Sequence, residues 1–573
     1  MNKQQLTDQH SFWNDAVFRL KSFVLTGKRS LRNLKAPPRK FNINKNLIQQ
    51  PVIAFSESNL WNPFDNKENW ILTAGKVENL RIAAKKLNGL EIKAHEIFSF
   101  WRHVGKPTRQ KGYVVGREIK EGCIVPTVAG GLCQLSNALY DAALNAHFDI
   151  VERHKHTKVI KGSLAEKDRD ATVKWNYIDL RFRSNFDFRI ETELTSEKLI
   201  VRFRSQQKNI PSSISEFRTK PFDQLNDCFS CGNFACFKHP DRSAEKQETA
   251  TTTFVLDERW EEFDAYIDEI ATDKDRFVIP LKKNSLIKAE RYAWKAIRQQ
   301  RTTATTAEGV YRALKLRYKS RNQNPFALNL HLDKKIAKAA AQQIPVEATH
   351  LVISQNLLPF LYESGVLGGR TFDVLMTRLP MEKLHERLDF AHAQHTESPT
   401  LNDFRASSSL ISTENKALTQ ARKIITPHSE IAEIFKYKVE ALNWKIPTLK
   451  NEKTTGNKIL FPASAVGRKG AYEIKRLAQE LNLELTIAGK STESPHFWDE
   501  VKIQKFSGNF QEVALVVYPT YVEHQPREIL KAIAHQIPII TTKACGIAPS
   551  EKVKIIEMGN FQQLKSEVLP YIM

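Results

Sequence analysis

The sequence predicts a multidomain protein in which an α+β domain precedes an α/β region built on parallel sheet. At 573 residues the chain is too long for one hydrophobic core, and roughly three to four domains are expected. Residues 171–182 alternate and are rich in β-branched and aromatic side chains, which is typical of an antiparallel strand. After residue 457 short apolar strands alternate with helical segments, which predicts a parallel sheet.

Composition describes an ordinary soluble protein, with 41% hydrophobic and 26% charged residues. No apolar run approaches the roughly 20 residues that span a bilayer, and the first residues lack a signal-peptide pattern. The six cysteines are too few for a disulfide framework in a chain of this length. We therefore expect a cytoplasmic protein, either free or peripheral on the inner face of a membrane.

The first 50 residues form a basic arm, with ten Lys or Arg residues against two acids in a chain of net charge +22. Helical spacing of apolar residues followed by a polybasic stretch predicts an anchor for an anionic membrane surface. The alternative is a helix packed on the next domain with its basic face in solvent. Nucleic acid is not expected, because no nucleic-acid-binding module is visible. The apolar positions are Trp13, Val17, Leu20 and Val24.

Cys133 follows the glycine pair of residues 130–131 and begins a predicted helix. The glycines form a tight turn without Cβ atoms, and the apolar spacing of residues 135–142 is that of an amphipathic helix. A thiol in the first helical turn is stabilised as thiolate by unpaired N–H groups and by the helix dipole. The position favours a nucleophile, whereas a structural cysteine in the core is the alternative.

Candidate partners for the thiol follow closely. His154 and His156 lie two apart on an expected strand, so either could meet the sulfur as a base, and Asp170 could orient that base. Gln134 could stabilise an oxyanion, and Arg153 could hold a substrate carboxylate. These residues predict acyl transfer or amide hydrolysis. The alternative for the histidine and the aspartate is a structural pair.

Several spaced motifs in residues 51–205 resemble the VanW-like proteins. The resemblance implies that His156 and Asp170 are the motif positions, which selects them over His154 as partners of Cys133. The family is named for genes that accompany glycopeptide resistance, so a cell-wall peptide substrate is implied by the name alone. The motifs are Phe98-Ser99-Phe100, Gly130 to Ser136, Val151 to Thr157, Asp170 to Val173 and Asp179 to Phe182.

Residues 206–245 are polar and irregular, and they carry three of the six cysteines within nine residues. Three thiols and one imidazole in a short loop match the ligand count of a tetrahedral zinc site. An iron–sulfur cluster with the histidine or an external fourth ligand is equally compatible. Free thiols and a surface histidine are the remaining alternative. The predicted ligands are Cys228, Cys231, Cys236 and His239.

A second candidate site lies in the last part of the chain, where Arg468 and Lys469 follow the carboxyl end of a predicted parallel strand. Ligands bind at this end of open α/β sheets, and two cations would neutralise a nucleotide diphosphate. Gly467 and Gly470 allow close approach of the backbone. A helix N-terminus after Glu523 would face the sugar or the phosphate.

Residues 250–573 resemble GT-B glycosyltransferases, most specifically from residue 420 onward. The motifs that carry the resemblance are Ala421 to Ser429, Phe461 to Glu473, Leu485 to Gly489, and Tyr518 to Pro526 with Ile537 to Thr542. The resemblance implies two domains with Rossmann-like parallel sheets, at 246–445 and 446–573, and a nucleotide-sugar donor. Retaining members carry two glutamates eight positions apart. Here Glu523 matches the first, but Lys531 occupies the second, and a lysine cannot accept ribose hydroxyl protons.

Together these features predict a bacterial cell-envelope protein of the vancomycin-resistance-like class. As an enzyme it would transfer sugar from a nucleotide donor to an envelope glycan or peptide acceptor, next to a thiol site. The alternative is a non-catalytic scaffold that binds an envelope precursor and whose transferase half is degenerate. Lys531 favours the scaffold, and the intact Arg468-Lys469-Gly470 turn favours the enzyme.

Overall fold

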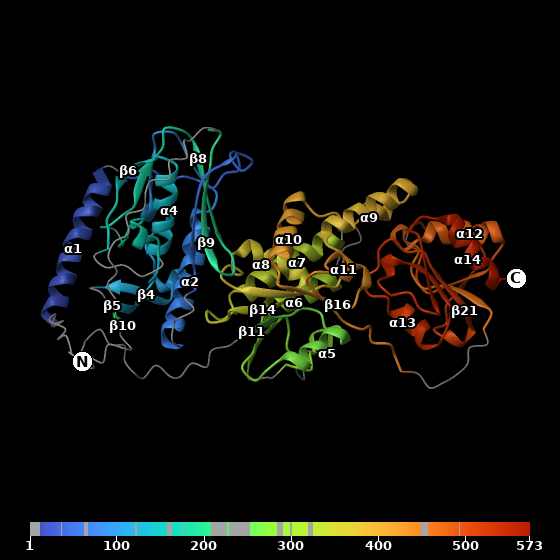
Figure 1. Cartoon of the computed structure of the whole chain (residues 1–573). Helices are drawn as coiled ribbons and strands as arrows, with labels where there is room; N and C mark the ends of the chain where they lie inside the picture. Colours follow the sequence, from blue (N-terminus) through green and yellow to red (C-terminus); the bar gives the residue numbers. More distant parts are fainter. Residues whose placement is uncertain are drawn as a thin grey trace. The chain divides into compact units, whose positions relative to one another are not determined.

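The computed structural model describes most of the chain. Two compact units are present: Met1–Thr249 with Pro345–Thr349 and Gly365–Arg370, and Ala250–Ile344 with His350–Ser364 and Thr371–Met573. We refer to them as unit 1 and unit 2 (Figure 1). The described residues are 12–35, 37–61, 67–120, 123–156, 163–175, 177–207, 226–227, 252–283, 290–297, 301–318, 325–448, 456–491 and 493–572.

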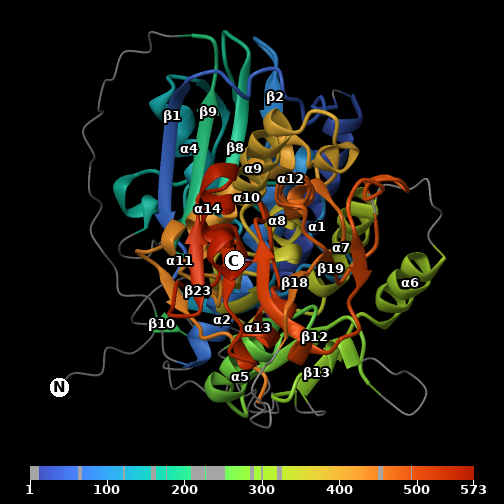
Figure 2. The ribbon, with the colours of Figure 1, turned by 90° about the vertical axis from the view of Figure 1, so that its right-hand side faces the viewer.

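Unit 1 is an α+β domain whose largest sheet is antiparallel, with the strand order β1-β9-β8-β2. Figure 2 shows β1, β9 and β8 side by side in that order. Helix α4 contacts β1 and β9, so it covers one face of this sheet. The strands are β1 (Val52–Asn59), β2 (Leu90–Ile92), β8 (Phe188–Leu194) and β9 (Lys198–Arg204), and the helices are α1 (Phe12–Lys35), α2 (Lys67–Leu87), α3 (Phe100–Val104) and α4 (Cys133–Asn145).

Two three-stranded sheets complete unit 1, with orders β3-β7-β6 and β10-β5-β4. The core between the elements is aromatic: the rings of Phe148 and Phe203 stack at 5.3 Å, and those of Phe98 and Phe182 at 4.7 Å. The strands are β3 (Ile97–Ser99), β4 (Val115–Lys120), β5 (Cys123–Val128), β6 (Asp149–Glu152), β7 (Arg181–Arg183) and β10 (Asn226–Asp227).

The predicted strand over residues 171–182 is wrong for most of its length. Only β7, at Arg181–Arg183, is a strand, and the preceding segment holds a single bridge between Lys174 and Ile178. Its backbone is used differently: the Ala171 N–H donates to the side chain of Asn137 on α4. The alternation of residue types in this segment therefore belongs to a loop, because alternation in sequence does not require a ladder of hydrogen bonds.

Unit 2 contains two wholly parallel sheets. The first has seven strands in the order β13-β12-β11-β14-β15-β16-β17, and the second has six in the order β20-β19-β18-β21-β22-β23. Each runs outward on both sides from a central switch point, which is the doubly wound, Rossmann-like order. The predicted fold class, an α+β domain followed by Rossmann-like parallel sheets, is confirmed.

Loops and helices join the successive strands within each sheet of unit 2. The strands are β11 (Thr252–Val255), β12 (Arg276–Ile279), β13 (Thr302–Ala304), β14 (His350–Ser354), β15 (Thr371–Leu375), β16 (Lys423–Thr426), β17 (Val439–Ala441), β18 (Lys458–Phe461), β19 (Leu485–Ile487), β20 (Ile503–Lys505), β21 (Val513–Tyr518), β22 (Ile539–Thr542) and β23 (Val553–Ile556). The helices are α5 (Glu261–Ile270), α6 (Thr306–Arg317), α7 (Pro325–Ala341), α8 (Leu358–Ser364), α9 (Met381–Gln394), α10 (Ser408–Gln420), α11 (Ser429–Ile434), α12 (Ala471–Leu481), α13 (Arg527–Ala534) and α14 (Phe561–Val568). Among the described residues, none of the helices combines the length and apolar character needed to cross a membrane.

The turn before α4 is fixed by its two glycines. Gly131 has φ +96°, and a Cβ there would lie 2.1 Å from Cγ of Lys76, whose ammonium donates to the Leu60 carbonyl at 2.6 Å. A Cβ on Gly130 would lie 2.7 Å from the backbone of Gly116 in β4. The start of α4 therefore rests on the backbone of a neighbouring strand, which only glycine permits.

We predict that Gly131→Ala lowers the free energy of unfolding of unit 1 by about 3 kcal/mol, because the alanine is strained in φ and overlaps Lys76. Gly112→Ala is the matched control: it has φ +86°, and its nearest contact would be 3.4 Å, so strain alone costs about 1 kcal/mol. The free energy of unfolding of both variants is measured by urea unfolding, with hydrogen exchange of the α4 amides as the probe. Equal losses in the two variants would contradict the packing argument.

Candidate functional site

The loop of residues 170–173 lies against the first turn of α4. The Ser136 hydroxyl donates to the Ala171 carbonyl at 2.5 Å, and the Asn137 Oδ1 accepts the Ala171 N–H at 2.7 Å. On its other side, the Thr172 N–H donates to the His154 carbonyl at 2.9 Å. The loop thus joins the helix that carries Cys133 to the segment that carries the histidines.

His156 and Asp170 are brought together by two hydrogen bonds. Asp170 Oδ1 lies 2.6 Å from the ring Nδ1 of His156, and Oδ2 accepts the His156 backbone N–H at 2.5 Å. The Asp170 side chain is 1% exposed and that of His156 is 17% exposed. Since Nδ1 faces the carboxylate, the imidazole has Nε2 left for another partner, which is the arrangement of a base held by an orienting group.

The thiol of Cys133 is close enough to His156 for the imidazole to lower the thiol pKa. Its sulfur lies 3.6 Å from the Thr172 hydroxyl. The Val173 carbonyl accepts from the same sulfur at 3.8 Å. Cys133, His156 and Asp170 therefore form one connected Cys–His–Asp arrangement, drawn from α4 and two loops.

The electrostatics favour a charged pair. Burial alone would raise the pKa of the Cys133 thiol, but the hydrogen bond and the positive charge of His156 outweigh it and lower that pKa below 9.0. Burial alone would lower the pKa of His156, but the hydrogen bonds with Asp170 and then with Cys133 raise it to about 10. The two shifts run in the directions that favour a thiolate beside an imidazolium, which is the activated form of a thiol nucleophile.

Two neighbouring residues, His154 and Gln134, take different places from those expected. Strand β6 ends at Glu152, so His154 is not on a strand with His156; its side chain is 49% exposed and lies 3.7 Å from Glu152. The Gln134 amide donates to the Ser58 hydroxyl at 2.9 Å and to the Asn59 carbonyl at 2.8 Å, which directs it toward β1. The Gln134 N–H donates to the Gly131 carbonyl, so neither group is aimed at the thiol as an oxyanion donor.

Arg153 is engaged by one aromatic side chain. Its guanidinium donates to the Tyr140 hydroxyl at 2.9 Å and lies 4.8 Å above the ring of the same tyrosine. A substrate carboxylate could still bind the remaining guanidinium N–H groups. Sequence reasoning missed Thr172 and the Val173 carbonyl as contacts of the sulfur, although both lie directly after Asp170.

The predicted donor residues straddle the switch point of the second sheet of unit 2. Gly467–Lys469 follow β18 as a short 3-10 turn, and Glu523 follows β21, the strand beside it. Gly470 has φ +80°, and a Cβ there would lie 2.3 Å from the Pro519 carbonyl oxygen. Ligands of doubly wound sheets bind at this place, between the carboxyl ends of the two central strands.

Lys469 and Glu523 form a mostly buried ion pair, with Nζ and Oε2 2.7 Å apart and side chains 15% and 13% exposed. Glu523 also accepts from the Tyr518 hydroxyl and from the backbone N–H groups of His524 and Gln525. Burial would raise the pKa of Glu523, but Lys469 and these donors hold it far below its ordinary value. The lysine predicted to meet a phosphate is thus already paired in this state.

Arg468 and Lys531 have separate surroundings. The guanidinium of Arg468 lies 4.5 Å from the ring centre of Phe404, and burial lowers its pKa. Lys531 lies on α13 with its ammonium 2.7 Å from Glu528 and is 48% exposed. It therefore faces solvent on one side of its helix, paired within the same helix.

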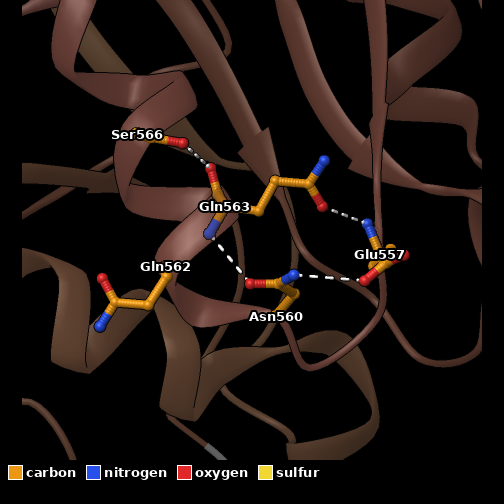
Figure 3. Close-up of a pocket in the computed structure, with 5 residues that line it drawn as sticks. All are labelled: Glu557, Asn560, Gln562, Gln563 and Ser566. Atoms are coloured by element: carbon orange, nitrogen blue, oxygen red, sulfur yellow. Dashed lines mark hydrogen bonds between the residues drawn. The ribbon is translucent and has the colours of Figure 1, made fainter.

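A hollow of about 620 Å³ lies beside α14, lined by polar side chains (Figure 3). The side chains are held by one another: the Gln563 N–H donates to Asn560 at 3.0 Å, and Asn560 donates to Glu557 at 3.2 Å. Since none of the predicted donor residues lines it, the hollow is separate from the predicted donor site. Its lining residues are Glu557, Asn560, Gln562, Gln563 and Ser566.

The predicted metal ligands, Cys228, Cys231, Cys236 and His239, lie outside the described residues, so the zinc or iron–sulfur site stays a prediction. Within the described part of the chain, no group of three or more His, Cys, Asp or Glu side chains is arranged to hold a metal ion.

Comparison with known proteins identifies the region that contains the thiol arrangement. Residues 75–204 match the family model described as VanW like protein. The chain is 38% identical over 137 residues to the vancomycin B-type resistance protein VanW of Enterococcus faecalis, covering 23% of this chain and 49% of that protein. It is 36% identical over 109 residues to the uncharacterized protein YoaR of Bacillus subtilis, covering 19% and 35%. The chain thus spans half or less of the length of these relatives.

Solved structures of glycosyltransferases are similar to part of the chain. The lipopolysaccharide outer core galactosyltransferase WaaB in its apo form has a TM-score of 0.32 and 11% identity, covering 56% of this chain and 90% of that one. Sucrose-phosphate synthase of Thermosynechococcus elongatus has a TM-score of 0.35 and 11% identity, with coverages of 56% and 90%. TarM has a TM-score of 0.31 and 11% identity, covering 42% and 51%. At TM-scores this low the likeness carries no argument beyond the strand order already described.

We predict that iodoacetamide alkylates Cys133 with a pH midpoint below 9.0, because His156 lowers the thiol pKa. The rate should fall only as the pH drops through that lowered value. In His156→Gln the burial remains and the cation is lost, so the midpoint moves above 9.0 and the rate at pH 7 falls at least about tenfold. Peptide mass spectrometry measures the rates.

His154→Gln is the matched control for this experiment, since His154 is exposed and faces Glu152. It should leave the alkylation profile of Cys133 unchanged. A profile that shifts equally in both histidine variants would show that His156 is not the partner of the thiol.

Proposed function

We propose that unit 1 carries a thiol-dependent acyl-transfer or amide-hydrolysis site in which Cys133 is the nucleophile, His156 the base and Asp170 the group that orients the base. The observation that supports the proposal most is the connected Cys–His–Asp arrangement with its opposed pKa shifts. A purely structural trio would gain little from a charged pair, because burying ions costs free energy.

In the proposed reaction the Cys133 thiolate attacks an acyl carbonyl, forming a carbon–sulfur bond and an oxyanion. The oxyanion collapses, the bond to the leaving amine breaks, and the His156 imidazolium gives its proton to that amine. A second nucleophile, water or an amine, then loses a proton to His156 and attacks the thioester. The thiolate leaves, and the starting ion pair is restored.

The proposed substrate class is supported by the relatives rather than by the geometry. One relative is named vancomycin B-type resistance protein VanW, which supports an envelope peptide as the acyl substrate. Arg153 would contact an acidic group of such a peptide through its remaining N–H groups. The competing class is a scaffold that holds an envelope precursor without turning it over.

We predict that p-nitrophenyl acetate acetylates Cys133 and that Cys133→Ala forms no adduct. His156→Gln should slow acetylation by about 10² to 10⁴, because the thiol loses its base. His154→Gln is the control and should react like the wild type, and melting temperatures exclude loss of folding. Peptide mass spectrometry detects the adduct. Equal acetylation of His156→Gln and wild type would support the scaffold.

For unit 2 we propose transfer of a sugar from a nucleotide donor to an envelope glycan or peptide acceptor. The supporting observation is the position of Arg468, Lys469 and Glu523 at the switch point of a doubly wound sheet. Two features favour the scaffold instead: Lys531 stands where retaining enzymes carry a glutamate, and Lys469 is already neutralised by Glu523. Removing Lys469 alone would leave a buried carboxylate uncompensated, at a cost of about 3–5 kcal/mol.

A substitution at Lys531 is therefore a cleaner test of the donor site than one at Lys469, whose removal would destabilise the fold. Uridine diphosphate should raise the melting temperature of unit 2, by linkage worth about 2.7 kcal/mol at 100 times its Kd. Lys531→Glu should tighten binding by about tenfold, since a carboxylate accepts ribose hydroxyl protons. Lys552→Glu, with the same charge change at another exposed lysine, is the control. No shift with any common nucleotide in wild type or Lys531→Glu would favour the scaffold.

A further inference from the structure

Helix α1 packs its polar side against the rest of unit 1. Arg29 forms an ion pair with Glu152 at the end of β6, and their side chains are 14% and 18% exposed. Asn33 accepts from the Arg181 guanidinium at 3.3 Å. Residues four apart lie on one face of a helix, so these contacts fix which side of α1 is covered. The other partly buried residues are Ser22, Thr26 and Ser30, on the same side.

The opposite side of α1 is apolar and exposed. Phe23 and Leu34 are both 78% exposed, and Leu20 and Leu31 are both 65% exposed. In a helix that packs by hydrophobic burial these side chains would face the domain, so α1 is inverted relative to an ordinary surface helix. The exposed apolar side chains of α1 are Val17, Leu20, Phe23, Val24, Leu25, Leu31 and Leu34.

A row of cations borders the apolar side. At 100° per residue, Lys21, Lys28 and Lys35 fall along one line, seven residues apart, and Arg32 lies beside it. All four side chains are exposed. A second copy of this chain would bring the same cations against each other, which disfavours self-association through this face. An apolar stripe edged by cations is complementary to an anionic lipid surface.

We propose that the exposed face of α1 binds an anionic lipid bilayer, with its apolar side chains at the level of the acyl chains and its lysines at the headgroups. The polar contacts of Arg29 and Asn33 attach unit 1 to the opposite side of the helix. This orientation lets the helix lie in the membrane interface without releasing the domain.

The test measures binding of the full chain to phosphatidylcholine vesicles with and without about 30% phosphatidylglycerol, at low and high salt. Wild type should bind only the anionic vesicles, and more weakly at high salt. Lys28→Gln, Lys35→Gln and Arg32→Gln combined should weaken binding about 100-fold, from a contribution of about fivefold per cation. Phe23→Gln, Leu31→Gln and Leu34→Gln combined should weaken it at least about 30-fold.

A charge-matched control removes three exposed lysines from unit 2: Lys502→Gln, Lys505→Gln and Lys552→Gln. It should bind vesicles like the wild type, and the melting temperatures of all variants should agree because every changed side chain is exposed. Equal loss in the control, or binding to neutral vesicles that salt does not change, would overturn the proposal. So would sedimentation showing a lipid-free dimer that the three apolar substitutions dissociate, because a second copy would then cover the face.

Discussion

The buried carboxylate of Asp170 is the interaction on which the thiol site depends. It accepts both the ring Nδ1 and the backbone N–H of His156, so the chain and the imidazole are held by one group. The loop that follows is tied to α4 through Ser136 and Asn137. Cys133, His156 and Asp170 are therefore linked through the short loop of residues 170–173. Cys133 also packs against the hydrophobic core of unit 1. Preorganisation of this kind keeps a nucleophile charged without rearrangement during a reaction.

The buried carboxylate of Glu523 in unit 2 has different surroundings from the groups around Cys133. Glu523 is surrounded by the Lys469 ammonium, the Tyr518 hydroxyl and two backbone N–H groups, so its charge is satisfied internally. Near Cys133 the titratable group is instead a thiol whose pKa is lowered by His156 and whose sulfur contacts the Thr172 hydroxyl and the Val173 carbonyl. A saturated carboxylate stabilises a fold, whereas a thiol with a lowered pKa keeps nucleophilic character. An incoming phosphate would have to compete with Glu523 for Lys469.

Part of the fold and of the candidate sites could be predicted from the sequence, because these features depend on local rules of backbone geometry and residue pattern. The glycine turn and the start of α4 follow from backbone geometry, and the parallel sheets follow from the alternation of apolar strands with helices. The rest needed long-range contacts. The alternation of residue types after Asp170 predicted a strand. The N–H groups of Ala171 and Thr172 bond instead to α4 and to the segment of His154. The amide of Gln134 likewise bonds to β1, a distant part of the chain. Residue type determines which hydrogen bonds a side chain can form, but it does not say which partner lies nearby.

The thiolate at Cys133 also has a consequence for redox chemistry. Peroxide oxidises the thiolate and not the neutral thiol, so the imidazolium that activates the sulfur for acyl groups also exposes it to conversion into sulfenic acid. Cys545 in unit 2 is fully buried, and burial raises the pKa of its thiol, which protects it from the same oxidant. Of these two cysteines, Cys133 is the one that peroxide would oxidise first, at the residue where the proposed chemistry begins.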